Sequence, residues 1–464
     1  MKKNILKILS FVFVFAFILT GCATVSNIKN DSEKLIYNGG HVALVGNHLY
    51  FANAYTPVGD SDTDFAYGNS AKVSYLNRLD LTKDFETELP IESPKGAEKV
   101  NSKVVGYENQ YMFVLGDYVY FTSANTHKTD KLQNTYKLVT FFRSRLNGDD
   151  LSEIFTTNQF DSATGTITTM KGADDKYYLV VFDGNELSTI RLGNSLGKRQ
   201  VVAKDVLSVA VPGEGEDYSV KEVFYTATHK DEDGNATSEV DIFSVNYATG
   251  VKTKRGAAGA GSKVNFIDRV GDTIFYTNSA VVGGGNECYS EDISLTSNFN
   301  GGNRFYSSTT LKNVTRVMQG DPLTEGYIFV NGNDSAIMYK NTVSGAETSL
   351  LLPKTNYTDI LFVEGDYVYY STTTGIYRIS ARDKSINTIV EMDSIVSGKC
   401  SYVNEYIYFY GQLDLEEEEE VEGETKVEYE EDTNNYMYRI KCDGNGGYQM
   451  LSTYTRVEKK SSTN

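Results

Sequence analysis

Tryptophan is absent from this chain of 464 residues, proline occurs six times, and cysteine and histidine occur four times each. So little cysteine excludes a disulfide-stapled scaffold, and so little cysteine and histidine together argue against a Cys/His metal centre. Basic residues are also outnumbered, because 44 Lys and Arg face 62 Asp and Glu, a formal net charge of −18. A chain of that charge has no electrostatic basis for binding a phosphate backbone, so nucleic acid is excluded as a partner.

Tyrosine, phenylalanine and glycine are abundant, with 34, 23 and 40 residues respectively. Aromatic residues favour strands, and glycine favours the tight turns between them. Almost no stretch shows a sustained apolar period of 3.6 residues, so helices are not expected. The composition therefore predicts an all-β protein.

The N-terminus has the pattern of a targeting segment. Lys2, Lys3 and Lys7 precede an apolar run over residues 8–19. This run is shorter than the roughly 20 residues that a spanning helix needs, and the positive charge lies on its N-terminal side. These features predict a secretory signal over residues 1–21 rather than a stable membrane helix.

The signal ends in Leu19-Thr20-Gly21-Cys22, which resembles the lipobox of bacterial lipoproteins. The resemblance implies cleavage after Gly21 and attachment of a diacylglyceryl group to the sulfur of Cys22. An ordinary signal peptide with an incidental cysteine is the alternative. Residues 22–34 are then the lipidated cysteine and a flexible tether, and the expected location is the extracytoplasmic face of the bacterial cell membrane, reached through the lipid anchor.

A strand motif recurs through the body of the chain: a Gly-Asp-like turn is followed by alternating aliphatic and aromatic residues. The clearest copies begin at Gly46, Gly116, Gly271 and Gly365, and weaker copies begin near residues 175, 221, 325 and 404. The average spacing is about 51 residues, and each unit has room for four antiparallel strands joined by polar turns.

Four strands in each repeat of this length predict a β-propeller of four-stranded antiparallel blades over residues 35–453. Eight blades are favoured and seven are the runner-up, because the units near residues 175 and 326 are weak. A β-sandwich or an elongated array of β-repeats is the alternative. Residues 35–37 are expected to join the final blade and close the ring, and residues 454–464 form a polar tail.

The repeat also has a family resemblance. The run Asp366-Tyr367-Val368-Tyr369-Tyr370 is followed by Tyr377-Arg378-Ile379, and Asp443-Gly444 supplies an Asp-Gly turn. This pattern resembles bacterial lipoproteins whose propellers carry tandem D-x-I/V-Y-Y repeats (DUF5050-like) and, distantly, the YWTD propellers of receptor ectodomains. The resemblance implies a fold and brings no catalytic motif.

No constellation in the sequence predicts catalysis or a cofactor, so no catalytic, cofactor-binding or metal residue is assigned. His41, His48, His127 and His229 are scattered over the repeats. The run Asp60, Asp62 and Asp64 resembles the start of a calcium loop, but Phe65 replaces the required Gly and Ala71 replaces the bidentate Glu. Only a loose calcium site in that loop stays open.

An acidic insertion lies in the last unit, over residues 411–435. Residues 414–432 contain twelve acids and one lysine. Mutual repulsion of these charges predicts a solvated loop, with binding of a cation or a basic partner as the alternative. Cys288, Cys400 and Cys442 are expected to be free thiols, because Cys400 and Cys442 are expected at opposite ends of one blade.

Two classes of function follow. The first is a non-catalytic binding or scaffolding module that holds an envelope protein, peptide or glycan on long loops at residues 52–74, 123–137, 279–304 and 411–435. The second is a cell-surface glycan hydrolase or lyase with paired carboxylates in the propeller channel. The first is favoured, because no nucleophile, base and orienting group are found together.

Overall fold

The computed structural model describes residues 28, 30, 34–55, 75–83, 97–104, 111–124, 139–156, 166–210, 219–257, 264–278, 288–294, 303–305, 314–319, 326–331, 335–351, 357–396, 398–412 and 434–453. All regular secondary structure in these residues is β-strand. The same residues contain no helix that is long and apolar enough to cross a membrane.

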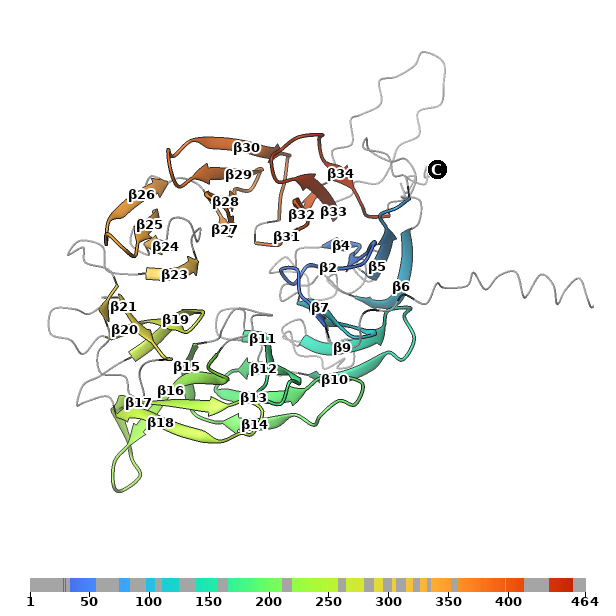
Figure 1. Cartoon of the computed structure of the whole chain (residues 1–464). Helices are drawn as coiled ribbons and strands as arrows, with labels where there is room; N and C mark the ends of the chain where they lie inside the picture. The colour runs from blue at the N-terminus through green and yellow to red at the C-terminus, as the bar shows by residue number, and fades with distance from the viewer. Residues whose placement is uncertain are drawn as a thin grey trace, which may run out of the picture.

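The described strands form eight antiparallel sheets that follow one another around a ring, as expected for an eight-bladed β-propeller (Figure 1). Each sheet is one blade, and its four strands run in chain order from the inside of the ring to the outside. The first four blades are β2 (Val42–Val45), β3 (His48–Ala52), β5 (Tyr75–Asp80) and β6 (Ala97–Val104); β7 (Met112–Leu115), β8 (Tyr118–Ala124), β9 (Val139–Arg145) and β10 (Ser152–Thr156); β11 (Thr166–Lys171), β12 (Tyr177–Asp183), β13 (Glu186–Arg191) and β14 (Gln200–Ala203); and β15 (Val206–Ala210), β16 (Glu222–Lys230), β17 (Ala236–Asn246) and β18 (Lys252–Ala257).

The second half of the ring repeats this order. Blades 5 to 8 are β19 (Val264–Val270), β20 (Thr273–Asn278), β21 (Cys288–Asp292) and β22 (Asn303–Arg304); β23 (Val314–Gln319), β24 (Gly326–Asn331), β25 (Ile337–Asn341) and β26 (Glu347–Leu351); β27 (Asp359–Glu364), β28 (Tyr367–Ser371), β29 (Gly375–Ser380) and β30 (Ile386–Glu391); and β31 (Ser401–Val403), β32 (Tyr406–Gln412), β33 (Asn435–Lys441) and β34 (Gln449–Met450). All eight repeat motifs of the sequence supply second strands, so the favoured blade number is confirmed. The long loop expected over residues 279–304 is wrong in part, since it contains β21 and β22.

The recurrent Gly-Asp pair has a local reason. It connects the first and second strands of a blade, and Gly46, Gly116, Gly271 and Gly365 have φ between 55° and 58°. A two-residue hairpin with positive φ at its first central position accepts glycine there at no steric cost. In these four blades the turn therefore fixes the register of the inner hairpin from the sequence alone.

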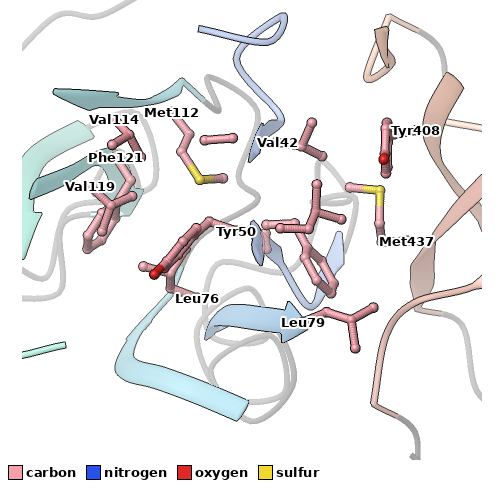
Figure 2. Packing of buried hydrophobic residues seen from close by; sticks show 14 of the residues in the cluster. Val42, Tyr50, Leu76, Leu79, Met112, Val114, Val119, Phe121, Tyr408 and Met437 are labelled. Atoms are coloured by element: carbon pink, nitrogen blue, oxygen red, sulfur yellow. The ribbon is translucent and has the colours of Figure 1, made fainter. Parts of the chain in front are cut away.

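The hydrophobic core is divided among the contacts between blades. Within the described residues, seven clusters of buried side chains follow the ring, most of them shared by two successive blades. The largest joins blades 1, 2 and 8, so it also crosses the point where the chain closes on itself (Figure 2). Tyr50 and Leu76 from blade 1 lie between Met112 from blade 2 and Met437 from blade 8 in this cluster.

Ring closure differs from the expectation for residues 35–37. The strand β1 (Leu35–Ile36) pairs with β7 at the inner edge of blade 2, with Leu35 opposite Leu115, and does not join blade 8. The chain then folds back through Gly39 and Gly40, which have φ of 80° and 83°, and begins blade 1 at Val42. The inner edge of β7 supplies the unpaired backbone groups that β1 needs, and two glycines allow the reversal.

The final blade is closed instead by a segment that follows β3. The short strand β4 (Ala54–Tyr55) pairs with β33, with Tyr436 opposite Ala54. Asn53 supports this contact through its side-chain oxygen, which accepts hydrogen bonds from the Thr453 backbone N–H at 2.8 Å and from the Thr453 hydroxyl at 3.0 Å. Residues about 400 positions apart in the chain therefore hold the two ends of the ring together.

A repeated Tyr–Arg pair joins neighbouring blades. The tyrosine lies on the second strand of a blade and the arginine lies opposite it on the third strand, as in Tyr50 with Arg78 and Tyr120 with Arg143. The Tyr50 hydroxyl and the Arg78 guanidinium both donate to the Leu146 carbonyl of the next blade, at 2.9 and 3.3 Å. Tyr369 and Arg378 of blade 7 reach the Cys442 carbonyl of blade 8 in the same way, at 3.2 and 3.4 Å.

The Tyr–Arg pair gives the arginine of the Y-R-I run, Arg378, a structural meaning, with Tyr369 of the preceding strand as its tyrosine. The carbonyl that it binds lies one or two residues beyond the third strand of the next blade, at Leu146, Gly193 or Cys442. A hydrogen bond from a charged guanidinium to such a carbonyl is among the stronger hydrogen bonds in proteins. These arginines are therefore committed to holding blades together.

Candidate functional site

The two faces of the ring are distinguished by the connections that they carry. We call the side with the turns between first and second strands, and between third and fourth strands, the turn face; the opposite side, where second strands connect to third strands and each blade connects to the next, is the loop face. Three second strands, β3, β8 and β32, are separated from the next strand of their sheet by 22, 14 and 22 residues, and these connections leave from the loop face. The corresponding turns of the turn face include several of only two residues, such as Gly116-Asp117. The loop face therefore carries most of the variable length of the chain.

The N-terminal segment approaches from the turn face. Leu35 lies opposite Leu115, which ends β7 at the turn face, and Ile36 lies opposite Val114, further toward the loop face. The chain before Leu35 therefore reaches the ring on the turn face, where one connection, the 16 residues between β5 and β6, is comparably long. Ile28 is half-buried against the core of blades 1, 2 and 8, so part of the segment expected to be a tether packs on the ring.

A pocket of about 430 Å³ lies between blades 7 and 8. It is lined by two carboxylates, a hydroxyl, a thioether and an aromatic ring, from Glu391, Asp393, Thr374, Met392 and Tyr448. Glu391 accepts a hydrogen bond of 2.9 Å from the Tyr377 hydroxyl, whose pKa is raised by burial and by this carboxylate. Carboxylates beside an aromatic ring and a thioether offer the contacts that a basic side chain takes.

This pocket adjoins the strand ends from which the acidic insertion leaves. The Met392 N–H donates to the Thr374 carbonyl at 2.9 Å, and the Gln412 N–H donates to the Ser394 carbonyl at 3.0 Å. Gln412 ends β32, and the acidic residues 414–432 follow almost at once. The pocket and the base of the insertion thus share one negatively charged corner.

The first strands are the place where the glycan-cleaving alternative requires paired carboxylates. The described first strands carry Asp268, Asp359 and Glu364. Asp268 accepts hydrogen bonds from the N–H groups of Arg269 and Val317, at 2.9 and 3.3 Å, and so connects blades 5 and 6. Asp359 and Glu364 stand at opposite ends of β27, about 16 Å apart along the strand, which exceeds the spacing of a glycosidase pair. The described first strands therefore lend this alternative no specific support.

The described histidines have separate surroundings. His41 is buried just before β2, and burial lowers the pKa of His48 at the start of β3. His229 Nδ1 lies 3.0 Å from the Asp241 carboxylate, whose other oxygen is 3.2 Å from Lys254 Nζ. Asp241 thus links the second and fourth strands of blade 4 across β17. The arrangement therefore joins the three strands through one ion pair, between Asp241 and Lys254, and one hydrogen bond, between Asp241 and His229.

The described cysteines are free thiols, as expected. Burial raises the pKa of Cys288 to about 12, which keeps that thiol protonated and unreactive. Cys442 donates its backbone N–H to Glu405 at the turn-face end of blade 8, whereas Cys400 precedes the other end of β31. Among the residues with assigned positions, no group of three or more His, Cys, Asp or Glu side chains is arranged to hold a metal ion.

Several sequence predictions fall outside the described residues. These are the lipobox with Cys22, the acids Asp60, Asp62 and Asp64, the residue His127, the acidic residues 414–432 and the tail 454–464. They stay predictions. Sequence reasoning missed the pocket between blades 7 and 8, because Thr374, Glu391 and Tyr448 come together only through the packing of two blades.

No protein-family model matches the chain, and no curated protein matches it. Solved structures with similar folds include TolB from Acinetobacter baumannii, with a TM-score of 0.33, 14% identity, and coverage of 55% of this chain and 60% of that chain. Oligogalacturonate lyase from Vibrio parahaemolyticus has a TM-score of 0.40 and 9% identity, over 82% of this chain and 95% of the other. Dipeptidyl peptidase 4 from Porphyromonas gingivalis has a TM-score of 0.44 and 9% identity, over 90% of this chain and 60% of the other. Likenesses this distant carry no functional argument.

Proposed function

We propose that this protein is a bacterial lipoprotein, anchored to the extracytoplasmic face of the cell membrane through Cys22, whose propeller is a non-catalytic binding module. One observation carries the proposal: the N-terminal segment meets the ring on the turn face, while most of the long connections leave from the loop face. An anchor on the turn face leaves the loop face directed away from the membrane, where a partner can reach it. The sequence Leu19-Thr20-Gly21-Cys22 supplies the anchor.

The proposed partner is an envelope protein or peptide that carries basic residues. The pocket between blades 7 and 8 presents Glu391 and Asp393, and the acidic insertion begins at the adjoining strand end. Positive charge on a partner would steer its approach to this corner, and salt would weaken the attraction between the two proteins. A rigid ring with variable connections on one face is a common support for such recognition.

Site-specific photocrosslinking in intact cells tests this orientation and the binding face together. A photoreactive residue replaces Thr373 or Asp233 on the loop face, and the matched control replaces Asn445 on the turn face. Thr373 and Asp233 lie in connections between second and third strands, and Asn445 lies in the connection between β33 and β34. We expect protein adducts from one or both loop-face positions that diminish at high salt, and none of the same size from Asn445. Adducts from Asn445 alone would overturn the proposed orientation.

The non-catalytic part of the proposal has a separate test. The purified mature chain is incubated with envelope polysaccharides and peptides, and the products are analysed by mass spectrometry. We expect no turnover. Turnover that disappears when Asp268, Asp359 or Glu364 is replaced by its amide, with folding intact, would establish the glycan-cleaving alternative.

A further inference from the structure

Large exposed aliphatic side chains are unevenly distributed over the two faces. The described residues contain six of them: Leu151, Val201, Leu207, Val251, Val343 and Ile386. All except Leu207 lie in or beside a connection between the third and fourth strands, at the turn face. Single exposed aliphatic residues need no explanation on a soluble surface, but five of six on one face form a pattern.

These five residues are spread around the rim of the ring. They belong to blades 2, 3, 4, 6 and 7: Val201 and Ile386 lie in the outermost strand of their blades, and Leu151, Val251 and Val343 lie in the connection that leads to it. The most exposed are Val343, at 75% of its full accessible surface, Val251, at 62%, and Ile386, at 51%. We call these five side chains the aliphatic rim. A flat apolar surface placed against the turn face would meet several of them at once.

The charge around the aliphatic rim is mixed, in contrast to the acidity of the whole chain. The described connections between third and fourth strands carry both signs: Lys83, Asp149, Asp150, Lys198, Arg199, Arg382, Asp383, Lys384 and Asp443. The run of twelve acids in residues 414–432 follows a strand that ends at the loop face. The densest run of acids therefore leaves from the loop face. The described turns between first and second strands, nearer the centre of the turn face, are themselves mainly acidic, with Asp117, Asp174, Asp175, Asp272, Asp366 and Glu405 against Lys176 and Lys221.

The N-terminal segment brings the aliphatic rim close to the proposed anchor. Ile28 packs against the core of blades 1, 2 and 8, so residues 23–27 are the only chain between this contact and Cys22. Five extended residues span at most about 18 Å. A lipid chain on Cys22 would thus hold the turn face near the headgroups of the bilayer.

We propose that the aliphatic rim is a membrane-contacting surface, whose side chains enter the interfacial zone of the bilayer that holds the anchor. The proposal rests on the proposed lipid anchor. Each side chain alone contributes little, but an anchored ring presents them together at high local concentration, so they fix its orientation. The rim then keeps the loop face turned outward.

The absence of tryptophan from the chain allows a direct test. Single tryptophans replace Val251, Val343 or Ile386, and Leu207→Trp is the matched control, because Leu207 is an aliphatic residue 54% exposed at the loop-face end of β15. Variants must keep the wild-type circular dichroism spectrum and melting temperature, and Ser344→Trp replaces any rim variant that fails. The lipidated full chain is reconstituted in vesicles of phosphatidylcholine and phosphatidylglycerol, with or without brominated phosphatidylcholine as a quencher. A second arm holds the mature chain on nickel-chelating lipid through an N-terminal histidine tag.

We expect a blue shift and a loss of emission with brominated lipid in the three rim variants, and neither in Leu207→Trp. If all rim variants keep their full emission while the protein floats with the vesicles, the proposed membrane contact of the aliphatic rim is wrong and the proposed lipid anchor still stands. Equal quenching of Leu207→Trp would overturn the orientation. Failure of the full chain to float would refute the anchor instead, and the nickel-chelating arm would still decide whether the rim meets lipid.

Discussion

Replacing Arg143 by methionine should weaken the contact between blades 2 and 3 strongly. The Arg143 guanidinium donates to the Gly193 carbonyl at 2.6 Å and to the Asn194 carbonyl at 3.3 Å, both in the next blade. It also lies 4.2 Å from the centre of the Tyr118 ring, and the residue is 8% exposed. Methionine keeps most of the volume and removes the charge and the donors.

The expected loss in the free energy of unfolding follows from the contacts that Arg143→Met removes. Hydrogen bonds from a charged donor contribute about 1.5–3 kcal/mol each, and a cation–π contact contributes about 0.5–2 kcal/mol. The two carbonyls also lose a buried partner, whereas the methionine side chain regains some apolar burial. We therefore expect the free energy of unfolding to fall by about 3–4 kcal/mol.

Arg145→Met is the matched control. Arg145 lies on the same strand, with its side chain 50% exposed, 5.4 Å from the same Tyr118 ring and 3.9 Å from the Asp150 carboxylate. An exposed ion pair of this kind contributes about 0–1 kcal/mol. The assay is urea unfolding of the mature chain, followed by near-ultraviolet circular dichroism, with hydrogen exchange at Gly193 and Asn194 as the local readout.

Equal losses in Arg143→Met and Arg145→Met would refute the idea that burial and the contact with the next blade give Arg143 its importance. So would a loss below about 1 kcal/mol in Arg143→Met, which is the ordinary effect of a surface change. A loss confined to Arg143→Met, with faster exchange at Gly193, would support it.

Three further predictions concern the anchor, the acidic insertion and pH. Cys22→Ala should move the protein from the membrane fraction to the medium or leave it as an uncleaved precursor, and a mature membrane-bound variant would contradict the lipobox interpretation. Deleting residues 416–432 and joining the ends with a short Gly/Asn turn should leave the melting temperature nearly unchanged, whereas a fall above about 8 °C would show that the segment packs or binds a structural cation. Burial raises the pKa of Tyr50, Tyr178, Tyr402 and Cys288 to about 12, from ordinary values of 10.0 for Tyr and 9.0 for Cys. The unfolded chain therefore loses these protons first, so stability should fall as the pH rises from about 9 to about 12, and unfolding monitored by tyrosinate absorbance checks this.

The blades were predictable because their signals are local. A glycine at the first position of a two-residue turn, as in Gly365-Asp366, sets the register of the hairpin that contains Tyr367 to Tyr370, whatever the rest of the chain does. The two-residue turn that begins with glycine recurs in blades 1, 2, 5 and 7, and the strand alternation recurs in all eight blades, so even the weak unit near residue 326 forms a blade. The free thiols also followed from strand order, since Cys400 and Cys442 lie near opposite ends of parallel strands.

The sequence by itself thus determined the all-β repeat and, through its N-terminal motif, the proposed location of the protein. Only the tertiary structure decided which edge β1 joins, how Asn53 meets Thr453, and that Arg143 and its counterparts bind carbonyls of the next blade. It also decided that the aliphatic rim and the N-terminal segment share one face. These features depend on contacts between residues separated by as many as 400 positions, and such pairing leaves no periodic pattern in the chain.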